Sequence, residues 1–172
     1  SVMERIEGDC ECDPGALDFL STHPITGERI ERARENMLVQ LRLLAETAPG
    51  LIMQLGDREA VAKLKPSEGE LTKLFDEQLQ EAARHCCDQI YRQGPLVDGL
   101  SADVRIEVVA APAGLLRWPN MLSDKFPGGY RDIAGWMNPK CIWLSWTVSA
   151  GPSVSRYDGL AWLEDRWVWL PK

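Results

Sequence analysis

Two histidines and five cysteines supply the side chains of this chain that most readily bind metals or act as nucleophiles. Cys10 and Cys12 form a C-x-C pair upstream of His23, so two thiolates and one imidazole could serve as metal ligands. The sequence offers no fourth ligand there and no second thiol pair of the kind that structural zinc sites use. We therefore expect reduced thiols at these positions and no metal site.

The second histidine, His85, directly precedes Cys86 and Cys87. A cysteine beside a histidine can act as a nucleophile with its base. Adjacent residues on a helix do not face each other, however, because successive side chains point about 100° apart. The sequence therefore favours a core position for Cys86, with His85 flanking it, over a catalytic pair.

The segment from Phe19 to Ile30 reads F-L-S-T-H-P-I-T-G-E-R-I. It resembles the closing signature of the M48-type zinc metallopeptidases, a group that includes the HtpX-like membrane proteases, and the resemblance covers residues 1–40. In that family the histidine and the arginine lie beside the zinc site. The resemblance thus implies that His23 positions substrate or stabilises the oxyanion, and that Arg29 holds acidic residues of the same site.

The zinc-binding helix of that family carries the sequence H-E-x-x-H, and this chain does not contain it. The resemblance therefore implies zinc in a parent enzyme and none held by this chain. It places the catalytic helix, and any membrane anchor, upstream of Ser1. The structural alternative is that this segment only begins a helix: Pro24 fixes the turn, Thr26 caps the helix and Arg29 pairs with a nearby glutamate.

Aromatic residues gather in the last third of the chain, where all seven tryptophans lie. Most of them fall on predicted strands, where a large apolar residue belongs to the core. Four aromatic residues outside the predicted strands surround a segment rich in proline and glycine. They form our candidate ligand-binding set, as a cleft or a partner surface: Trp118, Phe126, Tyr130 and Trp136.

Size and charge limit the possible functions. A chain of 172 residues is enough for one domain, or for a small domain with a helical appendage. Its 19 basic and 26 acidic residues give a net charge of −7, and no Lys/Arg cluster offsets it, so we expect no nucleic-acid partner. No apolar run approaches the roughly 18 residues that cross a bilayer, and no signal-peptide pattern opens the chain.

Helical periodicity marks the N-terminal half. One apolar stripe predicts a helix from about Gly27 to Ala48, ended by Pro49 and Gly50. Ser67 and Glu70 fit a capping box, which predicts one long helix that reaches about Arg92. The buried stripe expected for this second helix consists of Leu71, Leu74, Phe75, Leu79, Ala82, Cys86 and Ile90.

The hydrophobic period changes to two after Gly99, which predicts strands. The first contains Val104, Ile106 and Val108. A central strand over 141–149 places Trp143 on one face and Ile142, Leu144 and Trp146 on the other. Residues 156–163 and 166–170 are expected to form a hairpin.

These elements predict an α+β fold, in which a helical N-terminal segment precedes a long helix packed on a curved antiparallel sheet. The order of elements is analogous to that of NTF2-like and cystatin-like folds, an analogy that carries no function. We expect three parts: a metallopeptidase-like helical segment over 1–50, a connector over 51–65 and an α+β accessory domain over 66–172.

Two functions are consistent with this sequence. The first is the C-terminal region of an M48-type zinc metalloendopeptidase, whose accessory module binds a protein or peptide substrate or partner and is not catalytic by itself. The alternative is a stand-alone, non-enzymatic binding protein of the inhibitor or immunity type, with a Trp-lined cleft. An in-frame H-E-x-x-H motif upstream would distinguish the two.

Overall fold

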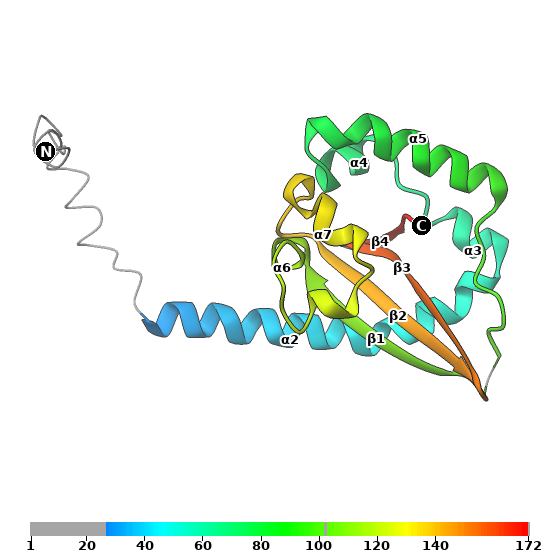
Figure 1. The fold of residues 1–172 in the computed structure, drawn as a ribbon, viewed down its shortest axis with the longest axis horizontal. Helices are drawn as coiled ribbons and strands as arrows, with labels where there is room; N and C mark the ends of the chain where they lie inside the picture. The colour runs from blue at the N-terminus through cyan, green and yellow to red at the C-terminus, as the bar shows by residue number, and fades with distance from the viewer. Residues whose placement is uncertain (1–26, 102, 172) are drawn as a thin grey trace, which may run out of the picture. The chain divides into compact units, whose positions relative to one another are not determined.

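The computed structural model describes residues 27–101 and 103–171 (Figure 1). The chain divides into two compact units, Ser1–Leu38 and Val39–Lys172. The boundary falls within the first described helix, α2 (Gly27–Ile52), so the described part of the first unit is a helical segment. All other described helices and strands belong to the second unit. None of the described helices has the length and apolar character needed to cross a membrane.

The last turns of α2 run past the predicted end of that helix. Pro49 lies inside α2, although a proline removes one backbone hydrogen bond. Ala48 and Ile52, on either side of it, are fully buried, and this burial favours four further helical residues. A short 3-10 helix, η2 (Met53–Gly56), and α3 (Arg58–Ala62) follow, and the Asp57 side chain accepts a 2.8 Å hydrogen bond from the Ala60 amide.

The long helix predicted after Ser67 is two helices, α4 (Glu68–Leu74) and α5 (Glu77–Gln93). The predicted capping box is present, since Ser67 and Glu70 each bond the other's backbone amide. Between the two helices Phe75 is extended and pairs with Met137, and the Asp76 amide donates to the Trp136 carbonyl at 2.8 Å. Pairing with this distant segment therefore replaces helical hydrogen bonds, which local sequence cannot reveal.

Four antiparallel strands form a meander in the order β1-β2-β3-β4. The strands are β1 (Arg105–Pro112), β2 (Ile142–Ala150), β3 (Ser153–Leu163) and β4 (Arg166–Trp169). Ala111, Trp143, Ala161 and Val168 stand opposite one another across the whole sheet. The predicted α+β class is confirmed, and so is the central position of the strand that carries Trp143.

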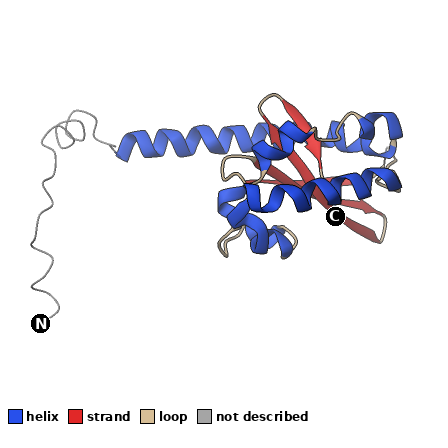
Figure 2. Ribbon diagram, turned by 90° about the horizontal axis from the view of Figure 1, so that it is seen from above, coloured by secondary structure: helices blue, strands red, loops and turns tan. Residues whose placement is uncertain are grey.

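Buried apolar side chains lie on both faces of the sheet. Figures 1 and 2 show α5 over one face and residues 39–52 of α2 behind the other. Trp143 belongs to the α5 side, where it packs with residues of α4 and α7 (Gly129–Ile133). Leu144 and Trp146 alternate with it and are buried on the opposite side, as period two requires.

The segment between β1 and β2 contains short helices and a fixed loop. The helices are α6 (Ala113–Leu116), η3 (Ser123–Lys125), α7 and η4 (Ala134–Trp136). The side-chain nitrogen of Asn120 donates to the Leu115 and Trp118 carbonyls, and its side-chain oxygen accepts from the backbone amides of Leu122 and Ser123. Asn120 therefore holds the loop that presents Trp118.

Candidate ligand-binding pocket

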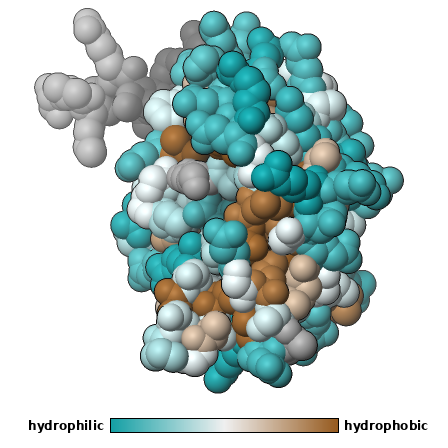
Figure 3. Space-filling model, turned by 90° about the vertical axis from the view of Figure 1, so that its right-hand side faces the viewer, coloured by the Kyte–Doolittle hydropathy of each residue, from teal (hydrophilic) through white to brown (hydrophobic). Residues whose placement is uncertain are grey.

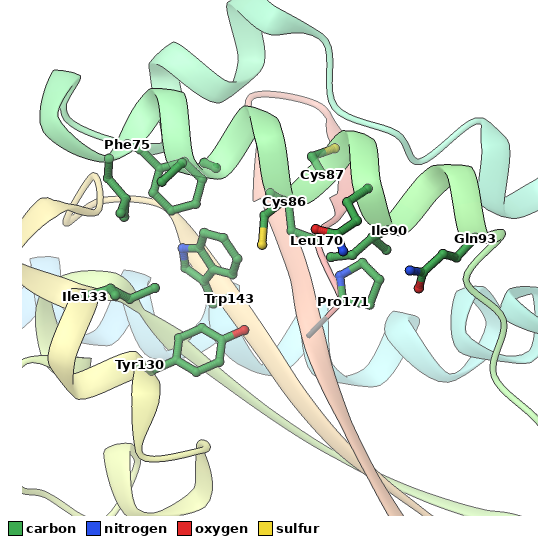
Figure 4. Close-up of a pocket in the computed structure, with 14 residues that line it drawn as sticks. Phe75, Cys86, Cys87, Ile90, Gln93, Tyr130, Ile133, Trp143, Leu170 and Pro171 are labelled. Carbon is green, nitrogen blue, oxygen red and sulfur yellow. The ribbon is translucent and has the colours of Figure 1, made fainter.

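An apolar pocket of about 540 Å³ lies between α5 and the sheet. Figure 4 shows side chains from α5, α7, β2 and the C-terminal segment around it. The full lining is Phe75, Leu79, Ala82, Ala83, Cys86, Cys87, Gln89, Ile90, Gln93, Tyr130, Ile133, Trp143, Leu170 and Pro171. Apolar surface also reaches the outside between polar residues on the side of the molecule seen in Figure 3. Pockets of this size and composition hold small ligands in many proteins.

The α5 wall of the pocket comes from the apolar stripe of that helix. Leu79, Ala82, Cys86 and Ile90 recur every three or four residues and all line the pocket. The core position predicted for Cys86 is wrong: Cys86 is exposed, and its neighbour Cys87 is buried instead. The stripe faces a hollow here, and Figure 4 shows the Cys86 sulfur directed into it. Burial raises the pKa of the Cys87 thiol, so this group stays protonated at neutral pH.

A β-bulge in β3 brings the C-terminal segment to the pocket. Leu144 stands opposite Leu160 but Ser145 opposite Asp158, so Gly159 is the extra residue. Gly159 has a φ of 93°, and a Cβ at this position would overlap the Leu170 carbonyl oxygen. The Leu170 amide donates to the Gly159 carbonyl at 2.8 Å. Only glycine permits this close approach, which places Leu170 and Pro171 against the pocket.

The same bulge positions an acidic partner for Tyr130. The Tyr130 hydroxyl donates to an Asp158 carboxylate oxygen at 3.0 Å, and the tyrosine side chain is almost completely buried. Burial, followed by the nearby Asp158 charge, raises the pKa of Tyr130 well above its ordinary value. The phenol is therefore neutral at physiological pH, and its proton is directed toward Asp158.

Aromatic rings form a continuous wall beside this pair. The Tyr130 ring meets Phe126 edge to face at 5.2 Å and Trp143 at 5.8 Å between ring centroids. Phe75 lies 5.9 Å from Trp143. Contacts in this distance range stabilise aromatic clusters beyond the area they bury, so these rings hold one another in place.

The indole nitrogen of Trp143 is buried and has no hydrogen-bond partner among the residues that the structure describes. The same holds for Trp146, which lies on the opposite face of the sheet and stacks on Tyr157. Of these two donors, only Trp143 lines the pocket. A buried donor without an acceptor costs roughly 1–3 kcal/mol of stability.

Of the four aromatic residues that we predicted to bind ligand, two are buried and two are exposed. Phe126 and Tyr130 are buried in the core cluster, and Tyr130 lines the pocket. Trp118 and Trp136 are 63% and 42% exposed and do not line it. The Arg117 guanidinium lies 5.4 Å from the Trp118 ring centroid, and η4, which ends at Trp136, contacts α6.

The two residues assigned by the metallopeptidase resemblance lie elsewhere. His23 is outside the described residues, as are Cys10 and Cys12. Arg29 is an exposed residue of α2 in the first unit.

The zinc implied by that resemblance has no fitting ligand set in the described residues. These residues contain one histidine, His85, which is exposed on α5. Across residues 27–101 and 103–171, no three or more His, Cys, Asp or Glu side chains come close enough to hold a metal ion. We therefore assign no zinc-dependent catalytic step to the described residues.

No protein-family model, curated protein or solved structure matches this chain. The pocket is therefore described from its own residues. Sequence reasoning missed Leu170 and Pro171 as lining residues. The only sequence signal for them was the single glycine, Gly159, inside an otherwise regular strand pattern.

Proposed function

We propose that residues 39–172 form a non-catalytic binding module that holds an apolar ligand between α5 and the sheet. The observation that carries this proposal is the apolar pocket of about 540 Å³. A space of this volume, bordered by an ordered aromatic wall, is what a ligand site requires.

The described residues of the pocket offer shape and apolar contact and no activated catalytic group. Its ionisable lining groups with altered pKa values are the Cys87 thiol and the Tyr130 phenol, and both are shifted toward the neutral form. Neutral thiols and phenols are weak nucleophiles and weak bases. These groups therefore support binding better than catalysis.

A pair of neighbouring substitutions on α5 tests the pocket. Cys86→Trp should fill the cavity, because the Cys86 side chain points into it, and should weaken binding of the neutral dye Nile red at least about ten-fold. His85→Trp places the same ring on an exposed position outside the lining and should bind the dye as the original chain does. Dye fluorescence gives both affinities. Equal binding by Cys86→Trp and the unchanged chain would contradict the proposal.

The metallopeptidase relationship is a separate proposal, supported by the segment from Phe19 to Ile30. In that case the module serves a zinc metalloendopeptidase as its accessory substrate- or partner-binding part. The exposed Trp118 and Trp136 offer a surface for a protein or peptide partner. The upstream reading frame tests this relationship, since it must encode H-E-x-x-H in frame with Ser1 if the relationship holds.

A further inference from the structure

The pocket has the shape of a long groove along α5. Its lining residues on this helix run from Leu79 to Gln93, which at the rise of an α-helix is a length of roughly 21 Å. Cys86 lies midway between them and is exposed, so the groove is open to solvent on one side. Figure 4 shows the opposite wall in the same order, with Ile133 toward the beginning of α5 and Pro171 toward its end.

The width of the groove limits what can lie in it. Its volume of about 540 Å³ divided by that length gives a mean cross-section of roughly 25 Å². An α-helix with its side chains is about 10 Å across, at least about three times this area, so it is too thick to lie within the groove. An extended hydrocarbon chain is roughly 4–5 Å wide, because non-bonded carbon atoms pack at about 4 Å from one another. The dimensions therefore favour a single unbranched chain.

The polarity of the lining changes along the groove. Toward the beginning of α5 it is aromatic and aliphatic, with Phe75, Trp143 and Ile133. Gln89 and Gln93 lie one helical turn apart near the end of α5, and their side-chain amides can donate and accept hydrogen bonds. Among the described residues that line the groove there is no Asp, Glu, Lys, Arg or His, so a charged group at the apolar end would lose its hydration without meeting a counterion. A ligand with one apolar end and one polar end matches this gradient.

We propose that the groove holds one unbranched hydrocarbon chain, such as that of a fatty alcohol or an acyl group, laid lengthwise along α5. Its polar end lies at Gln89 and Gln93, and its terminal methyl group lies toward Trp143. With C–C bonds of about 1.5 Å, an extended chain advances roughly 1.3 Å per carbon, so about 16 carbons span the groove. This inference rests on the proposed function, because it names the class of ligand for the same pocket.

Primary alcohols from hexanol to dodecanol test the shape of the ligand by displacing Nile red from the full chain. Their affinity should rise about two- to four-fold with each added methylene, because each one is buried along α5. Cyclododecanol has as many carbons as dodecanol and the same hydroxyl group, but its ring is wider than an extended chain. After correction for their partition between water and octanol, dodecanol should bind at least about ten-fold more tightly than cyclododecanol.

Two neighbouring substitutions test the lengthwise placement of the chain. Ala82→Trp fills the groove on the side of the terminal methyl group, at an exposed position where a large side chain does not disturb the core. It should leave hexanol binding within about two-fold of the unchanged chain and weaken dodecanol binding at least about ten-fold, because only the longer chain reaches it. Glu81→Trp places the same ring on an exposed position outside the lining and should change neither affinity.

Nuclear Overhauser contacts give the direction of the bound chain. The hydroxymethyl protons of dodecanol should contact the Gln93 side chain, and its terminal methyl protons should contact the Trp143 ring, which lines the pocket. The reverse set of contacts would overturn the proposed direction.

Other results would overturn the inference and leave the apolar pocket itself as a binding site. Equal corrected affinities of dodecanol and cyclododecanol would show that the site takes a compact ligand, and so would an equal loss of hexanol and dodecanol binding in Ala82→Trp. The inference alone also fails if no alcohol displaces the dye although Cys86→Trp weakens dye binding. If no alcohol displaces the dye and Cys86→Trp does not affect dye binding, the proposed function fails together with the inference.

Discussion

Tyr130 links the pocket to the stability of the second unit. Its hydroxyl is buried and hydrogen-bonded to Asp158, while its ring contacts both Phe126 and Trp143. This residue was predicted from the sequence as part of a ligand-binding aromatic set, on the ground that it follows two glycines. Its acidic partner is 28 residues away in sequence, and only the bulge at Gly159 brings the two together.

The raised pKa of Tyr130 predicts a loss of stability in alkali. In the unfolded chain Tyr130 ionises near pH 10, whereas in the folded chain it stays protonated to a higher pH. Between these two pKa values the unfolded state therefore binds fewer protons than the folded state. The free energy of unfolding should therefore fall as the pH rises above about 10. Tyr130→Phe should reduce this fall and should cost about 1 kcal/mol at pH 7 through the lost hydrogen bond. Urea denaturation at several pH values measures both effects.

Tyr91 provides a matched comparison for that experiment. Its hydroxyl donates to the Trp169 carbonyl at 2.9 Å, and burial raises its pKa as well. Tyr91→Phe should also reduce the alkaline loss of stability, and the double variant should reduce it further. An alkaline transition that is identical in the unchanged chain and in Tyr130→Phe would contradict the assignment of a buried, neutral phenol.

At the scale of elements, local signals predicted most of the helices and strands. The capping box at Ser67 and the alternating pattern of β2 are both in the structure, because each depends on residues that are close in sequence. The break between α4 and α5 was missed, because Phe75 pairs with Met137 and the Asp76 amide donates to the Trp136 carbonyl, both far away in sequence. The pocket was missed for a similar reason. The α5 stripe indicates an apolar face but does not show whether that face packs tightly or borders a cavity.

The bulge in β3 should be sensitive to substitution. Gly159→Ala should lower the free energy of unfolding by at least about 2 kcal/mol, because alanine is strained at this φ and its Cβ overlaps the Leu170 carbonyl. The same change should weaken binding of Nile red by moving Leu170 and Pro171 away from the pocket. Denaturant melts and dye titration measure the two effects.

Gly128→Ala is the control for the bulge. Gly128 has a φ of −55°, and a Cβ there would meet no atom within 4 Å. This variant should be as stable as the unchanged chain, or slightly more stable. If Gly159→Ala were as stable as Gly128→Ala, the close approach of the C-terminal segment would not matter for the fold.

At the scale of the whole molecule, the second unit extends further toward the N-terminus than the predicted accessory domain. Ile52 and Leu55 are fully buried, although both fall within the predicted connector. The Trp169 amide donates to the Leu64 carbonyl at 2.8 Å, and the Val97 amide donates to the Leu55 carbonyl at 3.0 Å. These contacts join the region just after α2 to the sheet and to the segment after α5.

Two fragments test this division of the chain. A fragment of residues 39–172 should melt cooperatively, because it keeps all of these contacts. A fragment of residues 66–172, the accessory domain predicted from the sequence, should lose cooperative melting, because it lacks the buried side chains of Ile52, Leu55 and Leu64. Thermal melts followed by circular dichroism measure both. Cooperative melting of the shorter fragment would support the division predicted from the sequence instead.

The most direct test of the binding function is an amide and indole ¹H–¹⁵N spectrum of the full chain during titration with the neutral dye Nile red. Signals of α5 residues at the pocket, such as Cys86 and Ile90, should move, and so should the indole signal of Trp143. The indole signal of Trp146 should stay in place, because this ring lies on the other face of the sheet. If no α5 signal moves, or only the exposed Trp118 and Trp136 respond, the space between α5 and the sheet is not the ligand site.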